Sequence, residues 1–478
     1  MKDLIYKYSN FVITKPLIIL ALVFLTIFIS FKGISNFKLD ASSDALVLEG
    51  DLALKKYREN EEEFGDSSFL IVTYEPNNEL FTKESLSTLE EIEQKLSSID
   101  GVDSVLSLLD APIFFQPKVS LTEVSDNLKD LTTEGIDLEL AKDEIINNPI
   151  YKDLIISADG SITAMQVVLR ANDEYDLLIS KRYEILDSLS AKEPITKEVR
   201  LSLIKELQSI NQRISSLNDN ESKFNSNLVQ EIRNILGFYK NEATLYLGGP
   251  AMITSDMMDY IKSDLVVFGS AVALVFAFML YLFFGNIWFV ILPILNAFFT
   301  TFVTAGFLGF MDWKISVVSS NFIALLLILT ISLTVHVLVK INELKKESSD
   351  YKNSLIDSVN QMFLPCFFAA ITTAVAFLSL LLGDLKPVIE FGKMMAFGIS
   401  IAFIFTFSFL PSAISLLKES QSKDYLSLHK ITNKILSLAK NNSLSVYLVF
   451  ASTFCILIFG TTKLIVENRF IDYFDEET

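Results

Sequence analysis

The sequence predicts an α+β membrane protein with seven transmembrane helices and one large external domain. The 478-residue chain is 51% hydrophobic, which is more apolar than a soluble protein of ordinary composition. Seven apolar stretches are long enough, or nearly so, to cross a bilayer. They are residues 16–31, 265–284, 287–311, 315–339, 362–383, 394–417 and 443–462. The long segment between the first two alternates strand-like and helix-like patterns, which predicts a folded domain.

Charge distinguishes this intervening segment from the rest of the chain. The formal net charge is −18, and Ile34–Lys262 alone holds 42 acidic and 22 basic residues. An acidic domain argues against nucleic acid as a partner, because phosphate binding requires basic patches. Both cysteines, Cys366 and Cys455, lie in apolar stretches, so no disulfide framework is expected in the domain.

Strand and helix patterns follow one another in the acidic domain. Phe69–Tyr74 is rich in β-branched and aromatic residues, and Thr82–Ser98 has helical periodicity. Further strands are expected at Val102–Leu108, Tyr151–Ser157, Ile162–Arg170 and Ala243–Leu247, with Asp159-Gly160 as a hairpin turn. This order predicts a split βαβ domain of the ferredoxin-like kind.

A heptad seam marks the second helical section of the domain. Its apolar residues step alternately by four and three, at Leu203, Leu207, Ile210, Ile214 and Leu217. We expect Asn218-Asp219-Asn220 to break the helix before the pattern resumes at Phe224. The prediction is a long helical hairpin whose two arms pack on each other and project from the domain.

The distribution of Lys and Arg predicts the orientation in the membrane. With a cytoplasmic N-terminus, the inside segments hold twelve Lys or Arg residues and the short outside loops hold two. No small-x-small cleavage site follows the first span, so we expect an uncleaved helix rather than a signal peptide. The protein is therefore expected in the plasma (inner) membrane as a multi-pass protein, with the acidic domain outside.

These observations divide the chain into five segments. They are the cytoplasmic N-terminus with the first helix (1–33), the extracytoplasmic domain (34–262), a five-helix bundle (263–417), a cytoplasmic linker (418–442) and a seventh helix with its exit (443–478). Leu22-Val23-Phe24 and Phe28 match Leu448-Val449-Phe450 and Phe454 in spacing. The match predicts the start of a truncated second repeat, with chance similarity between two apolar helices as the alternative.

The fourth apolar stretch is unusually polar. Ser332, His336 and Lys340 are four residues apart and share one helical face, and Thr330 and Thr334 lie close by. Polar groups in a membrane helix usually face a partner helix or a water-filled path. Ser and Thr also join neighbouring helices by hydrogen bonds. A helix–helix contact and a path for protons or substrate therefore both remain open.

Patterns for catalysis and cofactor binding are missing from the sequence. CxxC, HExxH, P-loop and GxGxxG motifs do not occur. Two histidines and two cysteines, far apart in the chain, do not predict a zinc site. We therefore expect neither an enzyme nor a bound metal or cofactor.

Several stretches share the motifs of one family of exporters. They are Lys15-Pro16, Ala41–Glu49, Phe64-Gly65, Pro365, Thr372-Thr373, Phe377–Leu380, Glu390-Phe391-Gly392, Gly398 and Leu410-Pro411. With the order of span, domain and five further spans, they resemble the N-terminal half of a resistance–nodulation–division (RND) exporter. The likeness is greatest to the MMPL branch, which is related to Patched and the sterol-sensing proteins.

The resemblance implies a secondary transporter that exports hydrophobic or lipid-like molecules by proton flow. The external domain would then be porter-like and form the substrate conduit. Because similar exporters use two halves, the partner is a missing second half or another copy in a homo-oligomer. One copy alone is not expected to transport. The alternative is a sterol-sensing-type protein that binds lipid or acts as a scaffold without transport.

The resemblance also singles out residues of the fourth and fifth helices. Many relatives carry an Asp-Tyr pair in the fourth helix, followed by His or an aromatic residue and then a basic residue. His336 and Lys340 match the last two positions, whereas the Asp position falls on Ser332. Serine does not exchange protons at physiological pH, which leaves His336 as the candidate proton carrier. The other candidates for the relay are Ser332, Thr334, Lys340, Thr372 and Thr373.

Overall fold

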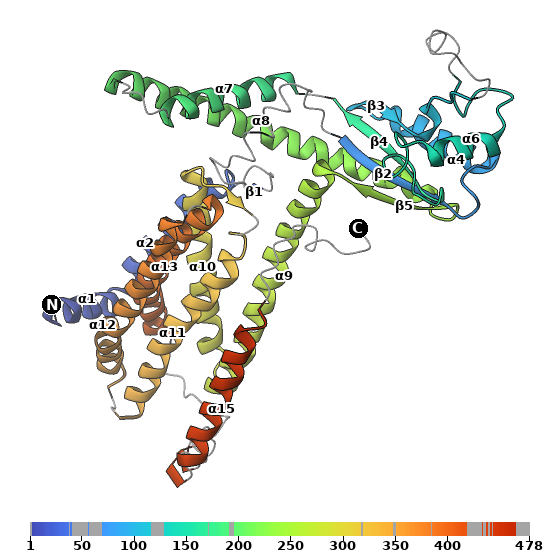
Figure 1. Ribbon diagram of the computed structural model, residues 1–478. Coiled ribbons are helices and arrows are strands. Elements are labelled where there is room, and N and C mark those ends of the chain that lie inside the picture. Colours follow the sequence, from blue (N-terminus) through green and yellow to red (C-terminus); the bar gives the residue numbers. More distant parts are fainter. Residues whose placement is uncertain are drawn as a thin grey trace. The chain divides into compact units, whose positions relative to one another are not determined.

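The computed structural model divides into two compact units, drawn in Figure 1. Met1–Asp40 with Tyr260–Glu477 forms the span unit, and Ala41–Asp259 forms the sheet unit. The structure describes residues 2–37, 39–40, 56, 69–115, 129–170, 172–190, 196–316, 319–347, 350–383, 385–417, 433, 436–437, 440–441 and 443–464. The chain is mostly helical, and its larger sheet lies in the sheet unit. Most of the predicted linker 418–442, and the family-like stretches 41–49 and 64–65, fall outside the described residues.

A four-stranded antiparallel sheet forms the centre of the sheet unit (Figure 1). Its strands are β2 (Phe69–Pro76), β3 (Val102–Leu106), β4 (Thr163–Leu169) and β5 (Ala243–Gly248), in the order β3-β4-β2-β5. Along β2, Leu70 and Val72 are buried while Ile71 is exposed, because neighbouring side chains of a strand point to opposite faces. Four of the five predicted strands are thereby confirmed, with small changes at their ends.

Helix α4 (Lys83–Ser97) packs against β3, β4 and helix α8. The hydroxyl of Thr82 accepts a hydrogen bond from Ser85 N at 3.2 Å, which caps the first turn. Leu89, Ile92 and Leu96 are fully buried, and their spacing of three and four puts them on one apolar stripe. The helix predicted at 82–98 is confirmed.

The strand predicted at Tyr151–Ser157 is wrong. These residues form turns, because the Tyr151 carbonyl accepts hydrogen bonds from the backbone N–H groups of Leu154, Ile155 and Ile156. The Tyr151 hydroxyl also donates to Pro112 O at 3.0 Å, which fixes the start of the segment. The predicted turn after it is present, with the Asp159 carboxylate accepting from the Ser157 hydroxyl at 2.6 Å and the Ser161 hydroxyl at 2.8 Å.

A long helical hairpin exists, but its arms differ from those predicted. Helix α8 (Lys197–Phe238) runs unbroken through Asn218–Asn220 and packs on helix α7 (Asp173–Ser190) (Figure 1). Asn and Asp weaken a helix by less than about 1 kcal/mol each, so two Asn and one Asp do not end it. The heptad seam is buried against α7, where Ile210 and Ile214 join Ile185 in one apolar cluster.

Seven described helices are long and apolar enough to cross a membrane, in agreement with the predicted number. They are α2 (Pro16–Ile34), α9 (Pro250–Phe284), α10 (Trp288–Phe310), α11 (Phe322–Glu347), α12 (Tyr351–Leu378), α13 (Lys386–Leu416) and α15 (Ser443–Thr461). Helices α10, α11, α12 and α13 pack together, and α2 packs on α10 and α13. These contacts place the core of the span unit between α10, α11 and α13.

Several predicted span boundaries need correction. Helix α9 begins at Pro250, well before the predicted residue 265. Helix α11 begins at Phe322 rather than Ile315, because Ile315–Ser316 forms the short strand β6 beside β1 (Leu39–Asp40). Helix α12 begins earlier than residue 362, since the Asp350 side chain accepts hydrogen bonds from two backbone N–H groups and caps its first turn.

A separate N-terminal helix precedes the first span. Residues 11–14 belong to this helix, α1 (Lys2–Thr14), and not to the span. Lys15 is non-helical and Pro16 opens α2, a position where the missing N–H of proline is tolerated. Helix α1 packs on α12 and α13, and the hydroxyls of Tyr8 and Ser408 lie 2.9 Å apart.

Small residues let α2 and α10 approach closely. A Cβ atom at Gly33 would overlap the carbonyl oxygen of Gly306, and one at Gly306 would overlap Ser30. Close backbone approach at small residues is a principal source of stability between membrane helices, because lipid is as apolar as the helices themselves. This crossing fixes α2 against the helix that carries the most buried polar residues.

Candidate polar site in the span unit

The residues predicted for a proton relay lie in different surroundings. Thr334 is fully buried, whereas Ser332 and His336 are exposed on another side of α11. Lys340 Nζ lies 3.0 Å from Glu343 Oε2 on the same helix. Within the described part of the chain, neither Ser332 nor His336 has a hydrogen-bond partner.

The two predicted residues of the fifth span do not join Thr334. Thr372 donates to Phe368 O at 2.9 Å and Thr373 donates to Ala369 O at 2.8 Å, both on their own helix α12. Each hydroxyl is therefore satisfied locally, and Thr372 is exposed while Thr373 is half-buried. In the described part of the chain, no side-chain hydrogen bond joins either hydroxyl to His336 or Thr334.

A different set of polar side chains does come together, between α10, α11 and α13. The Nδ2 group of Asn296 donates to Thr334 Oγ1 at 3.0 Å and to Thr406 Oγ1 at 3.1 Å. The two threonine hydroxyls lie 3.5 Å apart. All three residues are fully buried. We call this group the Asn296 cluster, and it joins three helices by side-chain hydrogen bonds.

Further hydroxyls extend from the cluster along two helix faces. Thr300 and Thr304 follow Asn296 at steps of four on α10, and Thr330 precedes Thr334 by four on α11. All three of these hydroxyls are fully buried and donate to a carbonyl of their own helix at 2.7–2.8 Å. Side chains four apart on a helix share one face, so both rows run along the inside of the bundle.

Two buried oxygens near this group lack a hydrogen-bond partner in the described structure, Asn296 Oδ1 and Thr301 Oγ1. Thr334 gives its own proton to Thr330 O at 2.7 Å, so its oxygen accepts from Asn296 Nδ2. The amide oxygen of Asn296 is then left facing no donor. An unpaired buried acceptor costs roughly 1–3 kcal/mol, which makes a water or a polar ligand group a favourable occupant.

The chemistry open to the Asn296 cluster is limited by its residue types. Amide and hydroxyl groups donate and accept hydrogen bonds but carry no charge at physiological pH. The cluster can therefore exchange hydrogen-bond partners when helices move, or bind a neutral polar group. It cannot itself take up a proton, and within α11 the ionisable residue nearest to it in sequence is the exposed His336.

Sequence reasoning missed Asn296 and Thr406. A signal for Asn296 was present, because an amide in an apolar span usually faces another helix. Thr406 had no comparable signal, since threonine is common in membrane helices and its hydroxyl is often satisfied by its own backbone. Thr334 was predicted, although with different partners.

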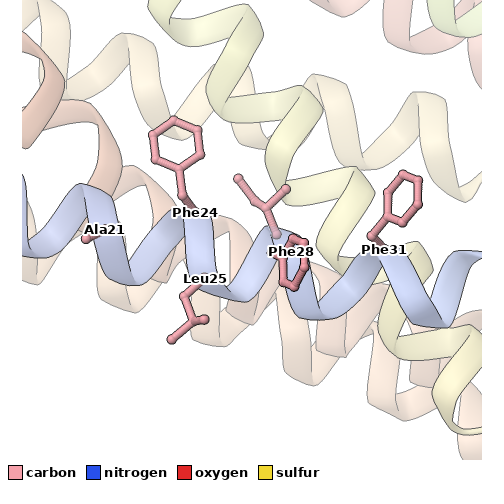
Figure 2. Close-up of a pocket in the computed structure, with 6 residues that line it drawn as sticks. Ala21, Phe24, Leu25, Phe28 and Phe31 are labelled. Carbon is pink, nitrogen blue, oxygen red and sulfur yellow. The ribbon is translucent and has the colours of Figure 1, made fainter.

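An apolar groove lies along α2 (Figure 2). Its volume is about 710 Å³, and it is lined by Ala21, Phe24, Leu25, Ile27, Phe28 and Phe31. Figure 2 shows Phe24 and Phe31 on the same side of the helix, as expected for residues seven apart. Phe24 meets Phe299 of α10 edge-on, and Phe31 stacks on Phe302. The groove offers a surface for an apolar chain.

The sheet unit has a more polar groove of about 550 Å³, near helix α6 (Leu138–Asn147). Its lining includes Asp143 and Glu144. The Glu144 carboxylate accepts hydrogen bonds from the backbone N–H groups of Phe114, at 2.6 Å, and Phe115, at 3.2 Å. Burial, with Glu144 nearby, raises the pKa of the Tyr151 phenol. Glu144 thus holds a loop in place.

Among the described residues, no group of three or more His, Cys, Asp or Glu is placed to hold a metal ion.

Comparison with known proteins finds similarity to a protein family and to a membrane protein. A model of the MMPL family matches residues 209–430, a range that includes α9, α10, α11, α12 and α13. The chain is also similar to a membrane protein of Methanocaldococcus jannaschii, with 20% identity over 425 residues. That alignment covers 87% of this chain and 94% of the archaeal protein. The chain is thus similar to the MMPL family over less than half of its length.

Proposed function

We propose that this protein is a secondary transporter that exports hydrophobic or lipid-like molecules by using proton flow, and that it is not an enzyme. One observation carries the proposal: the MMPL match covers the same helices that hold the Asn296 cluster. A buried polar group inside membrane helices is costly, and such groups often mark transport pathways. The match favours transport over a non-transporting lipid-binding or scaffold protein of the sterol-sensing type.

The groove on α2 supports a lipophilic substrate. Its lining is apolar, with three phenylalanines, and its volume of about 710 Å³ falls in the range of roughly 300–1,000 Å³ common for small-molecule sites. An acyl chain or a flat hydrophobic molecule meets these walls without leaving a polar group unpaired. The substrate class is therefore lipid or another hydrophobic small molecule.

Proton coupling is assigned to His336 in this proposal. The Asn296 cluster has no group that titrates at physiological pH, whereas histidine does so in its ordinary range. Protonation of His336 on α11 would act on the same helix that carries Thr334. A small shift of α11 would then exchange the hydrogen bonds of Thr334 with Asn296 and Thr406, which links the proton to a change in helix packing.

The sheet unit is proposed to be a ferredoxin-like, porter-like domain on the extracytoplasmic side. The strand order β3-β4-β2-β5, with α4 between β2 and β3 and α8 between β4 and β5, supports a split βαβ topology.

The excess of Lys and Arg in the predicted cytoplasmic segments supports the extracytoplasmic orientation of the sheet unit. An impermeant thiol reagent should label Ser209→Cys in intact cells with a single membrane. Labelling only after the membrane is permeabilised would contradict the orientation.

The proposal is tested by efflux of a lipophilic fluorescent probe from proteoliposomes that contain the full chain. Wild-type protein reconstituted at two or more copies in each liposome should accelerate efflux when a pH gradient is imposed, since one copy alone is not expected to transport. His336→Ala should remove the effect of the gradient, whereas Ser332→Ala, one turn away, should keep it. No gradient-driven efflux by wild-type protein would reject the function. A His336→Ala variant with unchanged pH dependence would reject the coupling role alone.

A further inference from the structure

Helix α1 lies at the end of a membrane span but is too short to cross the membrane itself. It has 13 residues, whereas a membrane-crossing helix needs about 20. Only Lys15 separates its last residue, Thr14, from Pro16, where the apolar helix α2 begins. Because α2 is long and apolar enough to cross the membrane, its first residue lies near the membrane surface. The short connection therefore holds α1 at that surface as well.

One side of α1 packs against the bundle near the end of another span. The helix packs on α12 and α13, and its residues Ile5 and Val12 are buried. The Ser412 hydroxyl of α13 donates to Val12 O at 3.3 Å, and the hydroxyls of Tyr8 and Ser408 are 2.9 Å apart. Ser408 lies about 12 Å along the helix before α13 ends. These contacts place α1 at the level of the last turns of α13, close to the membrane boundary.

The exposed side of α1 is divided into an apolar strip and a polar strip. The apolar strip is Leu4 and Phe11, which are seven residues apart and are 73% and 46% exposed. The polar strip includes Asp3, Lys7 and Asn10, all exposed. At 3.6 residues per turn, the apolar strip lies between the polar strip and the buried side of the helix. Helix α1 therefore has one side for the bundle, one for an apolar medium and one for water.

The apolar strip and the nearby charges fit a membrane surface with anionic lipids. A helix of this kind lies in the interface, with its apolar residues among the acyl chains and its lysines at the headgroups. Residues 1–15 carry three lysines, and Asp3 is their only acidic residue. Lys7 Nζ lies 3.0 Å from the Asp3 carboxylate, but both side chains are at least 75% exposed, so this pair is weak. Lys7 and the exposed Lys15 are thus available to anionic headgroups.

We propose that α1 is an interfacial helix that inserts Leu4 and Phe11 among the acyl chains and binds the phosphate groups of anionic lipids through Lys7 and Lys15. The ligand class is an anionic glycerophospholipid, such as phosphatidylglycerol. Since α1 also packs on α12 and α13, the bound lipid stabilises this part of the span unit. The inference stands on the exposed side of α1 and does not require transport.

Spin labels on the full chain test the apolar strip. The chain is placed in nanodiscs of equal parts phosphatidylglycerol and phosphatidylcholine, with Cys455→Ser as background because Cys455 is exposed and Cys366 is buried. Labels at Leu4→Cys and, separately, Asn10→Cys are compared by their collisions with oxygen, which concentrates in lipid, and with a water-soluble nickel complex. We expect an oxygen-to-nickel ratio several times higher at Leu4→Cys. Equal ratios at the two positions would overturn the insertion of α1.

Binding of a fluorescent phosphatidylglycerol to the detergent-solubilised full chain tests the headgroup contacts. Lys7→Gln and Lys15→Gln should each weaken binding about fivefold, and should not change the binding of the matching phosphatidylcholine. Asp3→Asn should strengthen phosphatidylglycerol binding, an effect that a merely structural role of α1 does not produce. Lys83→Gln is the matched control, because Lys83 is an exposed lysine of α4 in the sheet unit.

Each outcome decides the proposal. Loss of affinity with the two α1 lysine variants, and a gain with Asp3→Asn, support it. Equal affinity for the two lipids, or unchanged binding by Lys7→Gln and Lys15→Gln in protein that elutes as a folded species, would overturn it. An equal loss with Lys83→Gln would assign the binding to the charge of the whole chain and would also overturn it. Binding at α1 without gradient-driven efflux would leave this site intact and reject only the proposed function.

Discussion

The sheet unit and the span unit bury different kinds of side chain. The interior of the sheet unit is mainly apolar, with Leu70, Met165 and Ile232 fully buried, and its buried carboxylate Asp256 is paired with Arg233. The span unit buries the Asn296 cluster and a row of threonines, and it exposes large apolar side chains such as Leu274. Water drives apolar groups inward in the first case, whereas in lipid the association of helices depends on close packing and polar contacts. Burial of apolar side chains therefore stabilises the sheet unit, whereas in the span unit close packing and buried polar contacts hold the helices together.

The largest expected effect concerns the apolar core of the sheet unit. Ile232→Ala removes a fully buried side chain of α8 and should lower the free energy of unfolding by about 2–5 kcal/mol. Leu106→Ala, at a residue that is 50% exposed on β3, should have an effect below about 0.5 kcal/mol. Hydrogen exchange of sheet-unit peptides in the full chain measures both. Equal protection from hydrogen exchange in the two variants would contradict the claim that the apolar core stabilises the sheet unit.

The crossing of α2 and α10 in the span unit should be destabilised by a larger side chain at the contact rather than by a smaller one. Gly306→Leu on α10 forces α2 away at Ser30 and Gly33, and should destabilise the span unit by about 1–3 kcal/mol or more. Gly237→Ala is the matched control, because no atom lies within 4 Å of the position of its Cβ. Thermal unfolding in detergent, followed by loss of the monodisperse chromatographic peak, distinguishes them. A Gly306→Leu variant as stable as wild type would show that the close approach does not matter.

A smaller effect is expected from the Asn296 cluster. Asn296→Leu and Thr334→Val each remove one partner of the bond between α10 and α11, and hydrogen bonds between membrane helices contribute about 0.6 kcal/mol on average. A double-mutant cycle should give a coupling energy of this size. The pair Asn296→Leu and Thr372→Val should show no coupling, because Thr372 bonds only within α12 in the described structure.

The smallest effect concerns an exposed turn of the sheet unit. The hydroxyls of Ser157 and Ser161 donate to Asp159 and lower the pKa of its carboxyl from 3.8 to about 2. The ionised form is therefore favoured by folding, and its contribution is present above pH 3.8 and lost as the pH falls towards 2. The difference in unfolding midpoint between wild type and Asp159→Asn should shrink over that window. A difference that is constant with pH would contradict the role of this carboxylate.

Elements of the sheet unit could be predicted where the buried positions give the sequence a recognisable hydrophobic pattern. The β-branched and aromatic residues of Phe69–Tyr74 predicted β2, and the seam at Ile210 and Ile214 predicted a packed helix. The partner of that seam was predicted wrongly, because periodicity shows which face is buried and not what covers it. The strand predicted at 151–157 failed for a related reason, since hydrogen bonds to the Tyr151 carbonyl override the local β propensity.

The spans themselves followed from hydropathy, whereas the facing of their polar residues did not. A membrane helix is apolar on the side that faces lipid and on the side that faces its neighbouring helices. The hydropathy pattern of α11 therefore does not show whether Thr334 or Ser332 faces the bundle. The two residues are only two positions apart in the sequence. Thr334 nevertheless lies in the buried Asn296 cluster, whereas Ser332 is exposed. Only the packing of α10 and α13 on α11 distinguishes them.

The central claim is that the Asn296 cluster is the site through which helix movement and transport are linked. The most direct test is the initial rate of gradient-driven efflux in proteoliposomes, compared between wild type and Asn296→Leu at equal amounts of folded protein. We predict a loss of about tenfold or more, since a misplaced helix contact impairs the coupled step rather than folding. Efflux by Asn296→Leu at the wild-type rate would contradict the claim.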